Sequence, residues 1–106
     1  MVTRKVEAFG HRLRRLREEK CVAQVALADA VGISAPYLSR IETGVDAPPA
    51  EDVIRRLARA LVVDADELVV RAGRVPAKVA AWLVADPSRV AQVRALMKKT
   101  PGRRKP

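Results

Sequence analysis

Apolar residues recur every three or four positions along most of the chain, which is the spacing of one face of an α-helix. In residues 6–20, Val6, Phe9, Leu13 and Leu16 form one apolar stripe, while arginines and glutamates occupy the other faces. Similar stripes predict further helices over 24–31, 35–43, 50–61, 64–72 and 76–85, and after Asp86. Because no segment carries the two-residue alternation of a strand, the sequence predicts an all-α fold.

The predicted helices are separated by residues that favour helix ends. Ser34 is a good N-cap and Pro36 is tolerated in a first turn, so a helix is expected to begin between them. Gly32 stands where the preceding turn is expected to need a positive φ, which is cheap only for glycine. Asp64 has capping-box spacing to Glu67. The apolar residues expected to face inward are Leu27, Ala28, Val31, Leu38, Ile41, Val53, Leu57, Ala58 and Leu61.

Length and composition bound the class of protein. The chain of 106 residues suits one domain with an extension, and only 3% of residues are aromatic, so small aliphatic residues must build the core. One cysteine, Cys21, excludes a disulfide framework, and a single histidine, His11, excludes a zinc site built with it. We expect Cys21 to be a small buried or half-buried filler. No apolar run suggests a membrane span or a signal peptide, so we expect a cytosolic protein.

The residue types offer no catalytic set. The sequence contains no evident nucleophile–base pair, metal-binding cluster or glycine-rich loop that would cradle a phosphate. We therefore expect no enzyme activity, no metal and no cofactor.

Charge is strongly positive and unevenly distributed. Twenty-one Lys and Arg against twelve Asp and Glu give a net charge of +9, which is typical of small proteins that bind a polyanion, most often nucleic acid. Residues 1–22 carry seven bases and three acids, residues 23–73 five and eight, and residues 74–106 nine and one. Polyanion contacts are therefore expected to draw on both ends of the sequence. The alternative is a charged surface that serves only solubility.

Two short predicted helices joined at Gly32, over residues 24–43, have the layout of a helix-turn-helix. Ala28 is small, as a close helix crossing requires. Leu38 and Ile41 face inward on the second helix, and its outer residues are Ala35, Pro36, Tyr37, Ser39 and Arg40. Because an α-helix fits the major groove and its outer residues reach base edges, this helix is a candidate DNA-reading element.

The combined pattern resembles the Cro and phage-repressor helix-turn-helix proteins, also called the XRE family. The matching residues span 9–73 and read FGHRLRRLREEK, then Q..LA..VGIS..YLSRIE.G, then PP....I.RLA.AL.VD.DEL. The resemblance implies a five-helix, lambda-repressor-like DNA-binding domain in which 35–43 is the recognition helix. It also implies that Gln24 contacts DNA and that Arg17 and Glu42 form an interior ion pair.

Three positions depart from the family pattern. Cys21 stands where the family usually has glycine, and Ala23 stands in place of a Thr or Ser cap. The loop 45–47, which in the family often carries a basic residue that contacts a phosphate, carries the acidic Asp46 here. No long amide side chain begins the second helix, so Arg40 is the exposed residue there that can pair bidentately with guanine, and DNA shape is expected to add specificity. The residues expected to contact DNA are Gln24, Ser34, Ala35, Pro36, Tyr37, Ser39, Arg40 and Thr43.

Beyond the motif, residues 74–99 are predicted to form a two-helix extension, in which Asp86 caps the second helix and Pro87 is its first residue. Residues 100–106 are expected to be a disordered basic tail. Two short helices cannot form a core alone. The apolar stripe around Trp82 must therefore pack on its own domain, on a second copy or on another protein.

These features favour a sequence-specific transcriptional regulator with its DNA-binding domain in residues 1–73. The simplest form is a repressor that binds an inverted-repeat operator in double-stranded DNA as a homodimer, because one recognition helix spans only a few base pairs. The alternative is an antitoxin-like module in which residues 76–99 hold a partner protein and DNA binding serves autoregulation.

Overall fold

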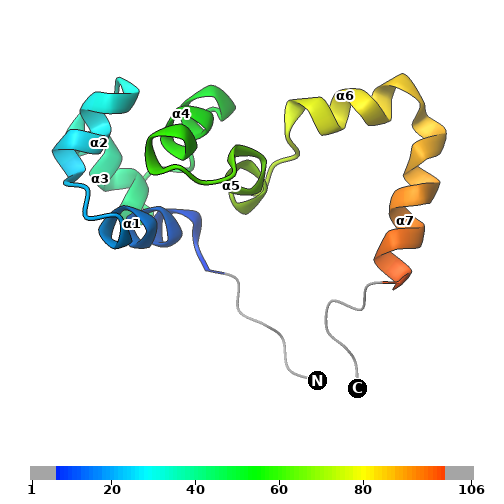
Figure 1. Ribbon diagram of the computed structural model, residues 1–106, viewed down its shortest axis with the longest axis horizontal. Helices are drawn as coiled ribbons and strands as arrows, with labels where there is room; N and C mark the ends of the chain where they lie inside the picture. The colour runs from blue at the N-terminus through cyan, green and yellow to red at the C-terminus, as the bar shows by residue number, and fades with distance from the viewer. Residues whose placement is uncertain (1–6, 100–106) are drawn as a thin grey trace, which may run out of the picture. The chain divides into compact units, whose positions relative to one another are not determined.

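The computed structural model describes residues 7–99, and every regular element in this part of the chain is helical, which confirms the all-α fold (Figure 1). The elements are α1 (Phe9–Glu19), α2 (Gln24–Val31), α3 (Ala35–Thr43), α4 (Glu51–Leu61), α5 (Ala65–Arg71), α6 (Ala77–Ala85), the short 3-10 helix η1 (Pro87–Arg89) and α7 (Val90–Lys99). Helices α1 to α5 belong to one compact unit that ends at Arg74, and the remaining helices belong to a second. Val6 and the expected tail over 100–106 lie outside the described residues.

One apolar core holds α1 to α5 together. Its fully buried large side chains are Leu13, Leu27, Val31, Leu38, Ile41, Ile54, Leu57, Leu61, Leu68 and Val69. Each contributes about 1.5–3 kcal/mol by leaving water, so packing rather than intrinsic propensity stabilises helices this short. Val53, which was expected to face inward, packs against the core but is only half-buried. The fully buried stripe of α4 runs through Ile54, Leu57, Ala58 and Leu61.

The turn between α2 and α3 follows the predicted local signals. Gly32 has φ 78° and ψ 31°, the left-handed conformation expected of it. Ser34 caps α3, because its Oγ accepts a hydrogen bond from the Tyr37 backbone N–H at 3.1 Å. The Ile33 N–H donates to the Ala28 carbonyl at 3.0 Å and closes the turn. The two motif helices are therefore fixed at a tight corner, and the small Ala28 is buried on α2.

Helices α1 and α3 approach each other so closely at Gly10 that no side chain fits there. An ideal Cβ added to Gly10 would lie 2.0 Å from the Ile41 carbonyl oxygen and 2.8 Å from that of Glu42. Both atoms belong to the backbone of α3, so neither can rotate away. The glycine is required by close backbone approach rather than by an unusual φ, and it lets α1 position the end of α3 directly.

Cys21 is exposed, which corrects the expectation of a buried or half-buried filler. It follows α1 with a φ of 58°, and its N–H donates to the Glu18 carbonyl at 3.0 Å while the Val22 N–H donates to the Arg17 carbonyl at 3.1 Å. These two bonds form a Schellman helix end, which usually has glycine at its left-handed position. The left-handed residue reverses the chain at the surface, so the Cys21 side chain points away from the core.

Replacing Cys21 with glycine is expected to stabilise the protein. A left-handed φ costs a non-glycine residue about 1–2 kcal/mol, and glycine loses about 0.5–1 kcal/mol of that gain through its greater freedom in the unfolded chain. The net gain of about 0.5–1 kcal/mol should raise the melting temperature by a few degrees in a thermal unfolding curve followed by circular dichroism.

The control for this prediction is Lys20→Gly, one residue earlier. Lys20 has φ −87°, which is comfortable for any residue, so glycine there is expected to destabilise the protein. A lower melting temperature for both variants would contradict the assignment of strain to Cys21.

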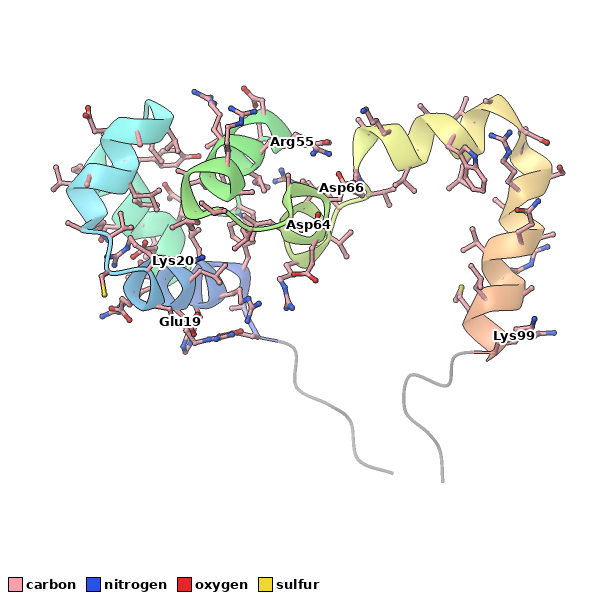
Figure 2. All side chains as sticks on the ribbon, viewed as in Figure 1. Glu19, Lys20, Arg55, Asp64, Asp66 and Lys99 are labelled. Carbon is pink, nitrogen blue, oxygen red and sulfur yellow. The ribbon has the colours of Figure 1, made fainter. Side chains whose placement is uncertain are left out.

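Helices α4 and α5 are joined by a left-handed turn at a second non-glycine residue and by an ion pair. Val62 has φ 56° and is exposed, and α5 begins where Asp64 Oδ1 accepts a hydrogen bond from the Glu67 N–H at 3.1 Å. Arg55 on α4 donates from Nη2 to Asp66 Oδ1 on α5 at 2.8 Å, and Figure 2 labels both side chains. The cap at Asp64 confirms the predicted start of α5.

In the second unit, Asp86 caps a short 3-10 turn rather than an α-helix. Its Oδ1 accepts a hydrogen bond from the Ser88 N–H at 3.2 Å, and α7 begins only at Val90, which shortens the helix predicted from Pro87. Arg89 donates from Nη1 to the Trp82 carbonyl at 2.7 Å, and its Cζ lies 4.6 Å from the centroid of the Trp82 ring. These contacts link α6 to the turn.

Apolar side chains on the second unit remain at the surface. Neither α6 nor α7 has a buried residue, and the exposed fractions of Trp82, Leu96 and Met97 are 45%, 62% and 69%. None of the helices described between residues 7 and 99 is long and apolar enough to cross a membrane.

Candidate nucleic-acid interface

Helix α3 presents a mixed outer face. Pro36 and Arg40 are exposed and Ser39 is half-buried. Ala35 and Tyr37, which the pattern places on the outer side, are half-buried and pack against the core. The tight corner after α2 brings the first turn of α3 toward the core, so these two side chains are only partly accessible to solvent.

Two hydroxyl groups at the ends of α3 already make local hydrogen bonds. Ser34 Oγ accepts from the Tyr37 N–H, which leaves its own O–H as a donor. Thr43 Oγ1 donates to the Ser39 carbonyl at 3.1 Å and lies 3.3 Å from the Arg40 carbonyl. Both side chains are exposed, so each can still meet a hydrogen-bonding partner from outside.

Arg40 is the strongest hydrogen-bond donor on this face, and it forms an ion pair with Asp46. Its side chain is 50% exposed, and its Nε donates to Asp46 Oδ2 at 2.9 Å. Its Cζ lies 5.8 Å from the centroid of the Tyr37 ring, close enough for a cation–π attraction. The sequence analysis missed the partnership with Asp46. The only signal for it was an acid six positions after the arginine, across a helix-ending glycine.

A buried carboxylate ties α3 to α1 and α2. Glu42 is 5% exposed, and Arg17 forks onto it with Nε donating to Oε2 at 2.8 Å and Nη2 donating to Oε1 at 3.0 Å. The Arg17 Nη1 donates to the Val22 carbonyl at 2.9 Å. The hydrogen bonds to Glu42 raise the pKa of Arg17 above its usual value, so the Arg17 guanidinium keeps its positive charge.

Gln24 belongs to the same cluster. It opens α2 and is half-buried, and its Nε2 donates to Glu42 Oε1 at 3.0 Å. The side chain that the family resemblance places at DNA therefore also has an internal partner. The structure brings Arg17, Gln24 and Glu42 together at the junction of three helices, beside the outer face of α3.

The arginines of α1 are largely paired with acids. Arg14 donates to Glu18 at 3.0 Å, and Arg15 contacts both Glu7 at 2.9 Å and Glu19 at 3.0 Å. Hydrogen bonding from Arg15 lowers the pKa of Glu7 below its usual value. Several of these side chains line a hollow between α1 and the end of α3. The positive charge expected of residues 1–22 is thus partly neutralised within the described part of α1.

Two further arginines that sequence analysis did not single out serve as backbone caps. Arg56 Nη1 donates to the Val31 carbonyl at the end of α2 at 2.8 Å. Arg74 donates to the carbonyls of Pro48 and Pro49 in the loop before α4, the former at 2.7 Å. These partners lie about 25 residues apart along the chain, so no local motif reports them. Part of the net positive charge therefore stabilises loops.

The outer face of α3 carries hydrogen-bonding and apolar groups that can bind a ligand. Within residues 7–99, no three His, Cys, Asp or Glu side chains gather where they could hold a metal ion. Helix α3 presents the guanidinium of Arg40, several hydroxyl groups and a small apolar edge, and its inner side is fixed to α1 by the ion pair between Glu42 and Arg17. Such groups can donate hydrogen bonds to base edges and phosphates.

Comparison with known proteins shows which family has this architecture. A family model described as a helix-turn-helix domain matches residues 8–72. An HTH-type transcriptional regulator of Mycobacterium tuberculosis is 40% identical over 85 residues, which are 80% of this chain and 53% of that protein. The HTH-type transcriptional repressor RghR of Bacillus subtilis is 40% identical over 70 residues, 66% of this chain and 52% of that protein. The chain spans about half the length of these curated relatives.

Two solved structures share the fold. The crystal structure of SinR, a master regulator for biofilm formation, in complex with DNA matches with a TM-score of 0.54 and 28% identity, covering 57% of this chain and 97% of that one. The clp gene regulator ClgR from Corynebacterium glutamicum matches with a TM-score of 0.56 and 25% identity, covering 90% of this chain and 93% of that one.

Proposed function

Because this chain belongs to the helix-turn-helix domain family, and within it to the Cro and phage-repressor (XRE) type, we propose that it binds specific sequences in double-stranded DNA to regulate transcription in the cytoplasm. Helix α3 enters the major groove. The observation that carries the proposal is the exposed Arg40 on an α3 that Glu42 and Gly10 fix to α1. The DNA-bound structure of the related SinR supports the same use of the fold.

In this proposal Arg40 reads guanine, and the other groups position the helix. Ser34, Tyr37 and Ser39 donate from their hydroxyl groups to phosphates or base edges. Thr43 contacts DNA at the end of α3. Ala35 and Pro36 offer apolar contact to a thymine methyl group. Gln24 contacts the DNA backbone from the start of α2 while it remains bonded to Glu42.

We further propose that the protein acts as a homodimer on an inverted repeat and represses transcription. One α3 covers only a few base pairs, so two copies related by a two-fold axis are needed for useful specificity. The relative RghR is named as a repressor. Residues 1–73 would form the DNA-binding domain and residues 74–99 the extension.

Selection of random duplex DNA by the purified chain tests the proposal, with binding measured again at two salt concentrations. The expected result is convergence on an inverted repeat whose half-site spacing reports the dimer geometry. Binding without sequence preference that collapses as salt rises would show non-specific phosphate attraction and would overturn it.

Replacing Arg40 with alanine is expected to relax specificity at one position in each half-site. A bidentate arginine–guanine pair discriminates by about 1–3 kcal/mol, so a substituted guanine should no longer be penalised by that amount. Fluorescence anisotropy on single-substituted duplexes measures the effect. Arg59→Ala, an exposed arginine on α4, is the control and should leave the pattern of preferences intact. An unchanged preference in Arg40→Ala would show that another residue reads the base.

A second candidate function is antitoxin-like capture of a partner protein by residues 76–99. It is favoured by the apolar side chains of α6 and α7, which are exposed and include Trp82, Leu96 and Met97. Sedimentation of the full chain and of a Trp82→Ser variant separates the cases. A dimer that the substitution dissociates would assign this face to self-association. A dimer that persists while a co-purifying protein is lost would support partner capture.

A further inference from the structure

The guanidinium of Arg40 is held by two neighbours on the described surface of α3. Asp46 Oδ2 accepts the Nε hydrogen at 2.9 Å, and the Tyr37 ring centroid lies 5.8 Å from Cζ. An exposed arginine normally samples many rotamers and loses that freedom when it binds. Here these two contacts restrain the side chain before any ligand arrives.

Asp46 is itself fixed by the backbone that ends α3. Gly44 has φ 83° and ψ 5°, which turns the chain back over the last helical residues. This turn brings the Asp46 N–H within 3.0 Å of the Arg40 carbonyl, to which it donates. Asp46 is thus linked to Arg40 twice, once through the backbone and once through the side chains. The position of the carboxylate is therefore determined by the helix that carries the arginine.

The geometry of this pair selects which edge of Arg40 can bind a ligand. An arginine can meet the two acceptors of guanine, O6 and N7, either with Nε and one Nη or with both Nη atoms. Because Asp46 engages Nε, the edge formed by the two Nη atoms is the one left with both donors for a base. A carboxylate bound at Nε also restrains the orientation of the planar guanidinium.

Resting on the proposed function, we propose that Asp46 is a specificity-determining residue that positions Arg40 for end-on recognition of a guanine in the major groove. Its negative charge has a second effect, since it repels the phosphate backbone and lowers affinity for every DNA sequence, which makes binding depend more on the contact with guanine. The loop after α3 often carries a basic residue in the XRE family, which this chain resembles. The acidic Asp46 in this loop lowers the affinity for DNA as a whole and increases the preference for the correct sequence.

The test compares the full-length protein with its Asp46→Asn variant on two duplexes, namely the selected site and the same site with the guanine read by Arg40 replaced. In Asp46→Asn the ratio of the two dissociation constants is expected to fall by about 5- to 30-fold relative to the unmodified protein. Binding to the replaced duplex should tighten, because one negative charge near the phosphates is gone. Binding to the other positions of the site should keep its pattern.

Two controls separate positioning from folding and from bulk charge. Asp52→Asn removes the same charge from an exposed residue that pairs with Arg56 on α4, at 3.4 Å, and should leave the ratio unchanged. In an Arg40→Ala background, Asp46→Asn should no longer change the ratio, because the side chain it orients is absent. The thermal unfolding curve of Asp46→Asn should match that of the unmodified protein.

The outcomes distinguish this inference from the proposed function. If the unmodified chain selects no sequence, the proposed function fails and the inference fails with it. If the chain selects a site and Asp46→Asn keeps the same ratio, or only binds every duplex more tightly, the proposed function stands and the positioning role of Asp46 is overturned. A loss of ratio that persists in the Arg40→Ala background would also overturn it.

Discussion

Replacing Gly10 with alanine is expected to abolish the native packing of α1 against α3. The new Cβ would lie 2.0 Å from the Ile41 carbonyl oxygen, well inside any van der Waals contact. Backbone atoms on both sides of the crossing would have to move apart, so the expected cost is more than about 3 kcal/mol, the upper end for overpacked cores. That is a large share of the about 5–15 kcal/mol by which small domains are stable.

Urea unfolding followed by circular dichroism measures this cost. The matched control is Gly73→Ala, since Gly73 has φ 82° and no heavy atom within 4 Å of an added Cβ. In that variant only the left-handed backbone conformation is strained, which should lower the free energy of unfolding by about 1–2 kcal/mol. Equal shifts of the two unfolding midpoints would contradict the steric explanation. DNA binding by Gly10→Ala should also fall, because the end of α3 loses its support.

The second large effect is expected from breaking the pair between Arg17 and Glu42. In Arg17→Met the aliphatic stem is retained, but a carboxylate that is 5% exposed loses its charged partner. Removing one member of a buried ion pair costs about 3–5 kcal/mol, because the remaining charge is neither solvated nor compensated. The loss should appear in the same urea titration.

The size of this effect depends on burial, and two further variants test that. The double variant Arg17→Met with Glu42→Leu should recover at least half of the lost stability, since neither charge then remains buried. Arg14→Met breaks an exposed pair with Glu18 and should cost less than about 1 kcal/mol. Comparable losses in Arg14→Met and Arg17→Met would show that burial of Glu42 is not the cause.

The parts of the fold governed by local signals were predictable from the sequence. The bounds of α2 and α3 agree with the prediction, because Gly32, Ser34 and Gly44 each set a helix end through their own backbone preference or side chain. The apolar periodicity likewise identified most of the core. Val53 is only half-buried because the adjacent Ile54, which the sequence analysis did not single out, takes the fully buried position on α4.

The missed features depend on contacts between distant segments or on turns that lack their usual residue. Nothing near Gly10 in the sequence tells that the backbone of α3 lies against it. The left-handed turn that exposes Cys21 is normally identified by a glycine, and here a cysteine occupies it. At the candidate site, the outer residues of α3 followed from helical spacing, but the pairing of Arg40 with Asp46 depends on how the chain turns after Gly44.

The exposed thiol at the end of α1 has a practical consequence. Cys21 is the only cysteine of the chain and Trp82 is its only tryptophan, and the two residues belong to different compact units. Both are accessible to solvent. A maleimide dye attached to the Cys21 sulfur can therefore act as the acceptor for fluorescence energy transfer from the Trp82 indole, and no residue needs to be engineered. The efficiency of this energy transfer would report the distance between the two compact units in solution.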